Sequence, residues 1–325
     1  MPNKYAESKG WNVPKQKHRV KNWSEYNKSL KSRGRIEVWL SDDAINLWYE
    51  KDTKYDGTGR PKVFSDFAII ICHEIRQVYR LPLRQCQGFI DSLFEIGNIP
   101  LKAPDYTCLS KRLSSLNIKS PRYKRTQKPD ASIEAIAIDS TGLKRFGRNE
   151  WHQEKHKVSA KRSWRKLHIA VDDKHYIHAV ELTDRFISDT EIAEELIDQI
   201  DTTIEHFSAD KAYDSNKIYE LLHEKYPDII IAIPTKKNAV CGRSNHDARN
   251  ATLMLRNHVG MMQWQKIMEY GRRNKSELCI ERYKVILGNK MHAREMSRQK
   301  QESIIGCGIL NKMTSLGVPE SYRIA

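Results

Sequence analysis

The sequence lacks the features of a membrane-spanning or exported protein. Its 325 residues contain no apolar run of roughly 18 residues, the length that a transmembrane helix needs. The amino terminus is polar and has no apolar segment of the kind found in signal peptides. We therefore expect a soluble protein of the cytoplasm with no membrane partner.

Cysteine is scarce and is not arranged in pairs. The six cysteines include no C-x-x-C pair, and their spacing matches no zinc module. Most of them lie within apolar runs, as buried free thiols do. This usage predicts a protein of a reducing compartment. The cysteines are Cys72, Cys86, Cys108, Cys241, Cys279 and Cys307.

Acidic residues are under-represented, mainly in the first part of the chain. The whole sequence carries 56 Lys and Arg against 41 Asp and Glu, a formal charge of +15. Residues 1–130 have 25 basic and 14 acidic residues, whereas residues 131–325 have 31 and 27. This uneven excess predicts that the front of the chain meets a polyanion, with ordinary solubility as the alternative.

The front of the chain resembles a basic arm, residues 1–60, followed by a small helical domain, residues 61–130. Residues 1–35 hold ten Lys and Arg and two Glu, which is typical of an arm that orders on a phosphate backbone or of a solvated tail. Three short helices suit a helix-turn-helix DNA-binding domain with Lys111 and Arg112 facing outward; a plain helical bundle is the alternative. Apolar spacing places the helices over about 65–79, 83–96 and 106–116.

Residues 131–325 alternate between short apolar runs and amphipathic segments, with residues 236–260 showing no clear period. The expected elements follow the order of an α/β fold, a ribonuclease H-like mixed sheet flanked by helices: three strands, then helix, strand, helix, strand and helix. In that order the first and fourth strands are neighbours at the centre of the sheet. Strands are expected over 135–138, 167–171, 176–182, the run before 210, and 229–233; helices over 189–200, 215–226, 263–283 and 293–316.

Three acidic residues stand out against this background. Asp139 and Asp210 each follow a short apolar run and so lie where a strand is expected to stop. Glu277 lies in the expected helix over 263–283. Two strand-end aspartates and one helical glutamate can together hold hard divalent cations through oxygen ligands, whereas a lone Asp139 would be read as a turn former.

The residues around Glu277 have helical spacing. Successive offsets of three, four and seven residues place all four members of this set on one helix face. An exposed face with solvated charges is the alternative. The set is Tyr270, Arg273, Glu277 and Lys284.

With these motifs the chain resembles the DDE transposases of bacterial insertion sequences, in particular the group with the signature Y-(2)-R-(3)-E-(6)-K. Both aspartates have similar contexts, A-I-D-S-T-G-L at Asp139 and A-D-K-A-Y-D at Asp210. Lys211 departs from the group, which often has Gly at that position. Further similar segments are W-R-K-L-H-I-A-V-D from Trp164, I-P-T-K-K-N-A from Ile233, Y-N-K-S-L-K-S-R-G from Tyr26 and Q-G-F-I-D-S-L-F from Gln87.

The resemblance implies an enzyme that binds the terminal inverted repeats of an element, cleaves DNA at the element ends and joins the 3′-hydroxyl ends to target DNA. It implies two-metal phosphoryl transfer with Mg²⁺, or Mn²⁺ as a substitute, in the bacterial cytoplasm. Double-stranded DNA is the expected partner, with self-association on DNA and no small-molecule substrate. The implied catalytic and metal-binding residues are Asp139, Asp210 and Glu277; the implied DNA-binding residues are Tyr270, Arg273 and Lys284.

Two other functions are compatible with the same residues. One is a ribonuclease H-like nuclease that cuts DNA and never joins it. The other is an inactive or domesticated DNA-binding derivative. Strand-transfer products would separate the first from a transposase, and an effect of triad substitution beyond DNA binding would separate the second.

Several further residues have weaker predictions. His152 and His156 have a spacing that can bind zinc on a helix, but no further ligand is near in sequence. Trp264 could stack on a base or lie in the core. Asp189 and Asp214 are read as helix caps. The basic run within residues 155–166 is expected to contact DNA backbone or to be a solvated hairpin.

Overall fold

The protein forms two compact units. One unit joins the two ends of the chain, Met1–Val38 and Lys312–Ala325, and the other comprises Trp39–Asn311. None of the helices that the structure describes is both long and apolar enough to cross a membrane. The functional division at residues 60 and 130 stays a prediction. The structure, a computed structural model, describes residues 17–51, 61–122, 132–145, 164–236, 238–242 and 247–324.

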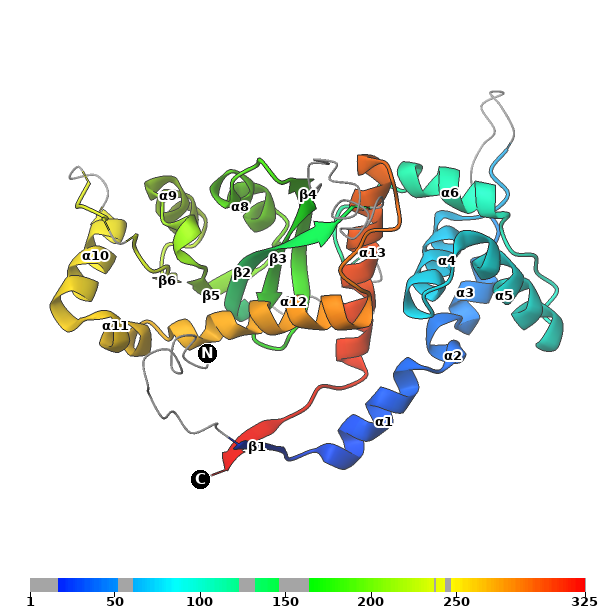
Figure 1. The fold of residues 1–325 in the computed structure, drawn as a ribbon, viewed down its shortest axis with the longest axis horizontal. Coiled ribbons are helices and arrows are strands. Elements are labelled where there is room, and N and C mark those ends of the chain that lie inside the picture. Colours follow the sequence, from blue (N-terminus) through cyan, green and yellow to red (C-terminus); the bar gives the residue numbers. More distant parts are fainter. Residues whose placement is uncertain are drawn as a thin grey trace, which may run out of the picture. The chain divides into compact units, whose positions relative to one another are not determined.

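The larger unit is built on a five-stranded mixed sheet (Figure 1). The strands are β2 (Ser132–Lys144), β3 (Trp164–Asp172), β4 (Ile177–Asp184), β5 (Thr203–Ser208) and β6 (Ile230–Ala232). Their order is β4-β3-β2-β5-β6, with β3 antiparallel to β2 and β4 and with β5 parallel to β2 and β6. This confirms the predicted ribonuclease H-like order, with β2 and β5 adjacent at the centre.

Helices cover both faces of this sheet and bury its apolar side chains in two cores. Two of them, α8 and α9, pack on one face. Two others, α12 and α13, pack on the opposite face, where Figure 1 shows α12 running across the strands. Their bounds are Asp189–Asp198 for α8, Asn216–Lys225 for α9, Asn274–Ile286 for α12 and Met296–Ser315 for α13.

The alternation of side chains along β2 assigns its residues to these two faces. Ile136 and Ile138 belong to the core with α8 and α9, whereas Leu143 belongs to the core with α12 and α13. Asp139 is an even number of residues from Leu143, so it lies on the α12 face of the sheet. The strand therefore delivers this carboxylate to the side from which α12 brings Glu277.

β2 continues past Asp139, although the sequence predicts that the strand stops there. Its antiparallel pairing with β3 runs on to Lys144, which lies opposite Trp164. Residues 140–142 are therefore paired strand and not a turn. A Cβ at Gly142 would meet the Trp164 ring at 3.3 Å, so this glycine allows close packing across the two strands.

The segment between β6 and α12 is helical where the sequence shows no clear period. It contains α10 (Asp247–Val259) and α11 (Met261–Ile267). Their apolar contacts are few, and Met254 and Met262 are exposed. A helix with so little buried surface leaves only a weak apolar period in its sequence.

The single helix predicted over 263–283 is wrong. The chain leaves α11 and reaches Glu269, which has left-handed backbone angles with φ of 46°. A short 3₁₀ turn, η2 (Tyr270–Arg273), then leads into α12. A left-handed glutamate is uncommon, so helical spacing alone could not reveal this break.

Residues 61–122 contain the three predicted helices. Ser65 caps the first of them, because its Oγ accepts a hydrogen bond of 3.1 Å from the Ala68 N–H. That helix packs against the other two and buries even His73 and Glu74. The helices are α4 (Asp66–Val78), α5 (Leu83–Ile96) and α6 (Tyr106–Ser115), and α2 (Ile36–Trp39) and α3 (Asp42–Asn46) precede them.

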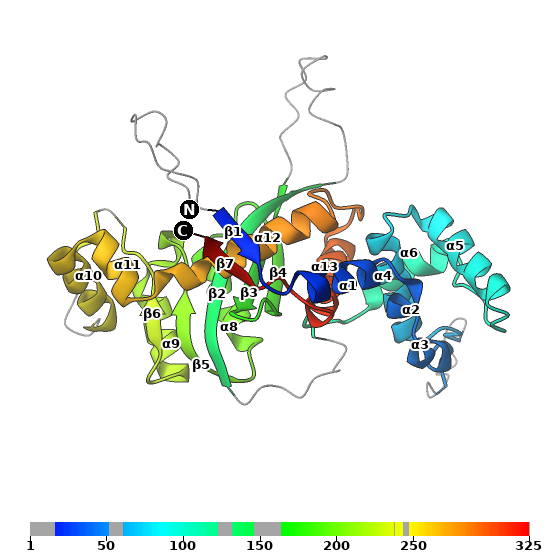
Figure 2. The same cartoon turned by 90° about the horizontal axis from the view of Figure 1, so that it is seen from below.

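The two ends of the chain pair with each other in the smaller unit. Figure 2 shows β1 (Lys17–Val20) beside β7 (Ser321–Ile324), and the two strands form an antiparallel sheet. A helix, α1 (Trp23–Arg33), follows β1. Residues 1–16 lie outside the described residues. Within the predicted basic arm, residues 17–33 contain β1 and α1, and β1 pairs with the carboxyl-terminal strand β7.

Candidate active site

Asp139 lies in β2, and Asp210 occupies the matching position just beyond the end of the neighbouring strand β5. β2 and β5 pair in parallel with a constant offset up to Ala137, which lies opposite Ser208. Asp139 is two residues beyond Ala137, and Asp210 is two residues beyond Ser208. The register therefore brings the two carboxylates to the same level of the sheet.

Glu277 reaches the same place from α12, where it lies in the first turn. Arg273 makes ion pairs with both Glu277 and Asp139, and its Nη1 is 3.3 Å from Asp139 Oδ2. One guanidinium thus ties the start of the helix to the strand. Asp210 lies close enough to act electrostatically on both Asp139 and Arg273.

The electrostatics of Asp139 reflect this crowding. Burial raises the pKa of Asp139 to about 6, although the Ser140 N–H and Arg273 both act to lower it. The charges of Asp210 and Glu277 raise this pKa further. Neighbouring carboxylates in a partly buried site repel one another, so binding of a positive charge there is favoured.

Arg273 lies beside the ring of Tyr270, which itself packs against Trp264. Burial alone would lower the pKa of Arg273, but Tyr270 and the three carboxylates outweigh it and raise that pKa. The guanidinium carbon lies 5.7 Å from the centre of the Tyr270 ring, which in turn lies 5.7 Å from the Trp264 ring centre. Trp264 is completely buried, which favours its role in the core over stacking on a base.

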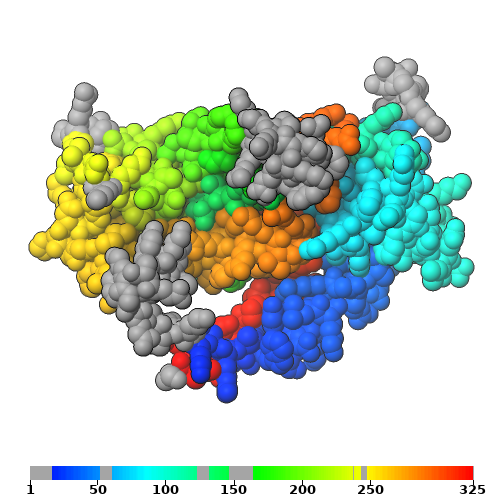
Figure 3. Space-filling view, in the orientation of Figure 1, coloured from blue at the N-terminus to red at the C-terminus, as the bar shows by residue number. Residues whose placement is uncertain are grey.

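The four-residue set around Glu277 is therefore split between two elements. Tyr270 and Arg273 belong to η2, whereas Glu277 and Lys284 belong to α12. Three of its members still meet, because Arg273 forms an ion pair with Glu277 across the junction and lies beside the Tyr270 ring. Lys284 lies two helical turns beyond Glu277 and is partly exposed on α12, a helix that Figure 3 shows at the surface.

Lys211 lies directly beside Asp210. It begins η1 (Lys211–Tyr213), a 3₁₀ turn that Asp210 caps by accepting a hydrogen bond of 2.7 Å from the Ala212 N–H. The Lys211 side chain is exposed. An ammonium group is thus available at the edge of the carboxylate cluster without being buried in it.

The cluster has the donor chemistry of a divalent-cation site. Asp139, Asp210 and Glu277 offer the carboxylate oxygens that hard cations prefer. Across the described residues, however, no three acidic, His or Cys side chains are gathered as closely as metal ligands are. Arg273 lies between Asp139 and Glu277 instead, so a cation bound by both would share or displace its guanidinium.

The two basic residues predicted on α6 have different surroundings. Lys111 is exposed. Arg112 forms an ion pair with Asp66 and donates a hydrogen bond of 2.9 Å to the Phe64 carbonyl, and its side chain is only 13% exposed. Arg112 therefore holds α6 to the start of α4, and this structure gives it no free guanidinium for DNA.

Asp189 is not the helix cap that the sequence predicts. Ser188 caps α8 in a capping box with Glu191. Asp189 instead lies 2.9 Å from the Lys166 Nζ and 3.4 Å from the His168 Nδ1. It links α8 to β3.

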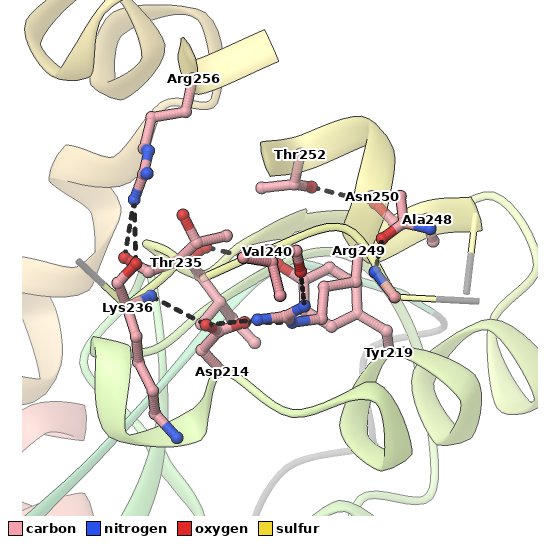
Figure 4. A network of polar contacts seen from close by, with 12 residues as sticks. Asp214, Tyr219, Thr235, Lys236, Val240, Ala248, Arg249, Asn250, Thr252 and Arg256 are labelled. Carbon is pink, nitrogen blue, oxygen red and sulfur yellow. Dashed lines mark hydrogen bonds and ion pairs between the residues drawn. The ribbon is translucent and has the colours of Figure 1, made fainter. Parts of the chain in front are cut away.

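The side chain of Asp214 is a buried ion-pair partner (Figure 4), and the N-cap of α9 is Ser215 instead. It accepts hydrogen bonds from Arg249 Nε at 2.7 Å and Nη2 at 3.0 Å, and one of 2.8 Å from the Lys236 N–H. This contact fastens α10 to the chain beyond β5. Sequence reasoning missed Arg249, because it lies 35 residues from Asp214 in a segment without a clear period.

Other predictions concern the segment that follows β2 and the first residues of β3. His152 and His156 lie outside the described residues, as does most of the basic run within 155–166. Its two described members are engaged within the protein. Arg165 pairs with Asp184, and Lys166 donates a hydrogen bond of 3.0 Å to the Ile187 carbonyl.

Comparison with known proteins matches this site to a family. Residues 31–148 and 130–311 each match a family model described as a transposase DDE domain. Two solved structures are also similar, each weakly. The piggyBac transposase synaptic complex with hairpin DNA has 11% identity and a TM-score of 0.38, covering 91% of this chain and 76% of that chain. The Drosophila P element transposase strand transfer complex has 12% identity and a TM-score of 0.32, covering 85% and 86%.

The second family match spans β2 to α13 and so contains all three acidic residues of the cluster. It extends over more than half of the chain. The likenesses to the two solved structures add nothing to this assignment, because their TM-scores are low. On the strength of the family matches, the chain belongs to the DDE transposases.

Proposed function

We propose that this chain is the transposase of a bacterial insertion sequence, which cleaves DNA at the ends of its element and joins the freed 3′-hydroxyl ends to target DNA. The observation that carries the proposal is the parallel register of β2 and β5, which sets Asp139 level with Asp210 just beyond the end of β5, with Glu277 brought to the same face by α12. This is an arrangement of oxygen ligands suited to phosphoryl transfer.

The three carboxylates would hold Mg²⁺, or Mn²⁺ in its place. Bound there, a pair of such ions would lower the pKa of the attacking water or hydroxyl and would stabilise the negative charge on the leaving oxygen. Asp139 has to be ionised for this role, and its raised pKa of about 6 leaves it mostly ionised at neutral pH.

The reaction consists of two displacements at phosphorus. In the first, the oxygen of water bonds to phosphorus and the bond to the 3′ oxygen breaks, which leaves a 5′-phosphate and a 3′-hydroxyl. In the second, that 3′ oxygen bonds to a phosphorus of the target, and the target's own 3′ oxygen leaves. Both steps need the phosphate held in line with the attacking oxygen.

The basic residues beside the cluster suit the binding of phosphate. Arg273 carries a planar fork that can leave Glu277 and contact two phosphate oxygens. Lys284 presents a second cation on α12, and Tyr270, kept neutral by a pKa of about 12, can donate from its hydroxyl. Lys211, which stands where the family often has glycine, adds an exposed cation next to Asp210. This cation can contact a phosphate.

The helical module formed by α4, α5 and α6 is the proposed binding domain for the terminal inverted repeats. Lys111 on α6 is exposed and free to contact a phosphate, whereas Arg112 supports the module from within. Pairing of two element ends requires at least two protomers on DNA. A measured mass of one protomer per paired-end complex would contradict this last point.

The experiment uses a duplex that carries the inverted repeats flanking the gene. Wild-type protein, Asp139→Asn and the surface control Asp198→Asn are incubated with Mg²⁺, and the 3′ ends are mapped. Asp198 is 64% exposed on α8, so its substitution matches the loss of one carboxylate away from the cluster. We expect cleavage at the repeat boundary, and joined products on added plasmid, with wild type and Asp198→Asn alone.

Other outcomes would replace the proposal. Cleavage without joined products would indicate a nuclease that never joins DNA. Binding without cleavage by all three proteins would indicate an inactive DNA-binding derivative, and restoring cleavage with Lys211→Gly would then identify Lys211 as the cause.

A further inference from the structure

The two ends of the chain build a separate basic ribbon. β1 and β7 are antiparallel, with Lys17 opposite Ile324 and Arg19 opposite Tyr322. Because directly opposed residues share a face, Lys17, Arg19 and Tyr322 lie on one side of the ribbon. His18 and Arg323, also opposed, lie on the other.

The ribbon is fixed by contacts inside its own unit. Asn22 donates a hydrogen bond of 3.0 Å to the Val318 carbonyl and accepts one of 2.8 Å from the Glu320 N–H. Arg33 of α1 donates one of 2.8 Å to the Gly317 carbonyl, where φ is 136°. The carboxyl-terminal strand is therefore positioned by residues of the amino-terminal segment.

The unit carries a strong positive charge. Its described residues, 17–38 and 312–324, contain nine Lys and Arg and three Asp and Glu. The cations of the ribbon and the turn after it are exposed. They are Lys17, Arg19, Lys21 and Arg323.

The ribbon has two edges and a charged surface that could take a partner. A two-stranded sheet is marginally stable in water, and both outer edges of this one have no strand beside them in the described chain. A second copy would place like charges against each other at these edges. Duplex DNA offers the opposite charge, and its grooves admit a two-stranded ribbon.

We propose that the β1–β7 ribbon is a second DNA-binding element, separate from the helical module, which grips the phosphate backbone of a duplex and which the carboxyl terminus completes. The inference goes beyond the proposed catalytic function. DNA binding by the ribbon requires neither the carboxylate cluster nor a metal.

The test measures binding of the full chain to a labelled duplex of the gene's flanking sequence, and to a scrambled duplex, in EDTA at several salt concentrations. Arg19→Ala/Arg323→Ala removes one cation from each strand. We expect affinity to fall about tenfold or more for both duplexes, and the slope of log K against log salt to decrease by about 2. The control Lys217→Ala/Lys225→Ala, on α9, should leave the slope unchanged.

A truncation separates the ribbon from simple charge. Ending the chain at Pro319 removes β7 with one basic and one acidic residue, so the net charge does not change. We expect a loss of affinity comparable to that of the double variant, because β1 loses the strand that orders it. Circular dichroism and thermal melting of the truncated protein serve as controls that the rest of the chain is folded.

The possible results have distinct meanings. An unchanged salt slope in both the double variant and the truncation would overturn the inference, whatever the activity of the protein. A dimer without DNA that the truncation alone dissociates, with DNA binding unchanged, would assign the ribbon to a second copy instead. Ribbon-dependent binding by a wild type that fails to cleave with Mg²⁺ would overturn the proposed function and leave this inference intact.

Discussion

Two aspartate–arginine pairs of the same unit differ in how fully they are satisfied. Asp214 is fully buried and receives three hydrogen bonds, two of them from Arg249. Asp139 is 17% exposed and shares Arg273 with Glu277, at a longer distance of 3.3 Å. Arg273 Nε has no hydrogen-bond partner among the described residues.

The difference separates a pair that is fully used within the protein from one that has capacity left for a ligand. A buried pair with every acceptor used has no capacity left for a ligand and serves to hold α10 in place. A cation shared between two carboxylates, with its Nε unbonded among the described residues, has capacity for a further partner. The following predictions test this contrast, beginning with the largest expected effect.

Removing a carboxylate of the cluster should abolish the reaction. Asp210→Asn or Glu277→Gln is expected to lower the rate of DNA cleavage by roughly 10³-fold or more, about 4 kcal/mol of barrier, because an oxygen ligand is lost. The rate is measured with the duplex of flanking sequence. Retention of more than a tenth of wild-type activity would exclude that residue from the catalytic set.

Breaking the buried pair should mainly affect folding. Arg249→Ala leaves Asp214 buried without its partner, and we expect the free energy of unfolding to fall by about 3–5 kcal/mol in urea titrations. Asp214→Asn/Arg249→Met removes both charges and should cost less than the single change. A loss below about 1 kcal/mol in Arg249→Ala would contradict the structural role.

The raised pKa of Asp139 predicts that its ionised carboxylate lowers the stability of the folded chain. The folded chain holds this proton up to about pH 6, above the ordinary value of 3.8, so the group's contribution to stability falls as pH rises between these values. Asp139→Asn should therefore be more stable than wild type at pH 7 without metal, by on the order of 1–3 kcal/mol. The advantage should vanish near pH 4. Thermal melts across this range test it, and an advantage independent of pH would contradict the assignment.

A change at Arg273 that keeps its charge but not its shape should impair activity more than stability. Arg273→Lys is expected to lower cleavage by about 10–100-fold, because a lysine cannot bridge Asp139 and Glu277 or grip a phosphate with two N–H groups. Its unfolding free energy should change by less than about 1 kcal/mol. Arg249→Lys is the matched control, for which loss of stability should exceed loss of activity.

A third pair, Asp66–Arg112, should show the smallest effect. Asp66 is 55% exposed, so we expect Arg112→Ala to cost about 1 kcal/mol in urea titrations. Lys111→Ala should leave stability unchanged and weaken binding to the flanking duplex. The reverse pattern would restore Arg112 as the DNA contact and make Lys111 incidental.

Local patterns in the sequence were sufficient where the structure depends on short-range physics. The helices α4, α5 and α6 begin and end close to the predicted residues, because capping groups and apolar spacing act over a few residues. The strand order followed from the alternation of elements. In contrast, the break at Glu269 and the continuation of β2 to Lys144 depend on packing that no local signal contains.

The sequence by itself determined which residues could carry the chemistry, because only a few carboxylates follow apolar runs and Glu277 has the spacing of a known signature. Tertiary structure alone decided how they are used. The parallel register sets Asp210 level with Asp139, and the turn at η2 aims Arg273 between two carboxylates. It also paired Asp214 with Arg249, and β1 with β7 across almost the whole chain. Such pairings join residues distant in sequence, and their energy comes from burial and charge that exist only once the chain has folded.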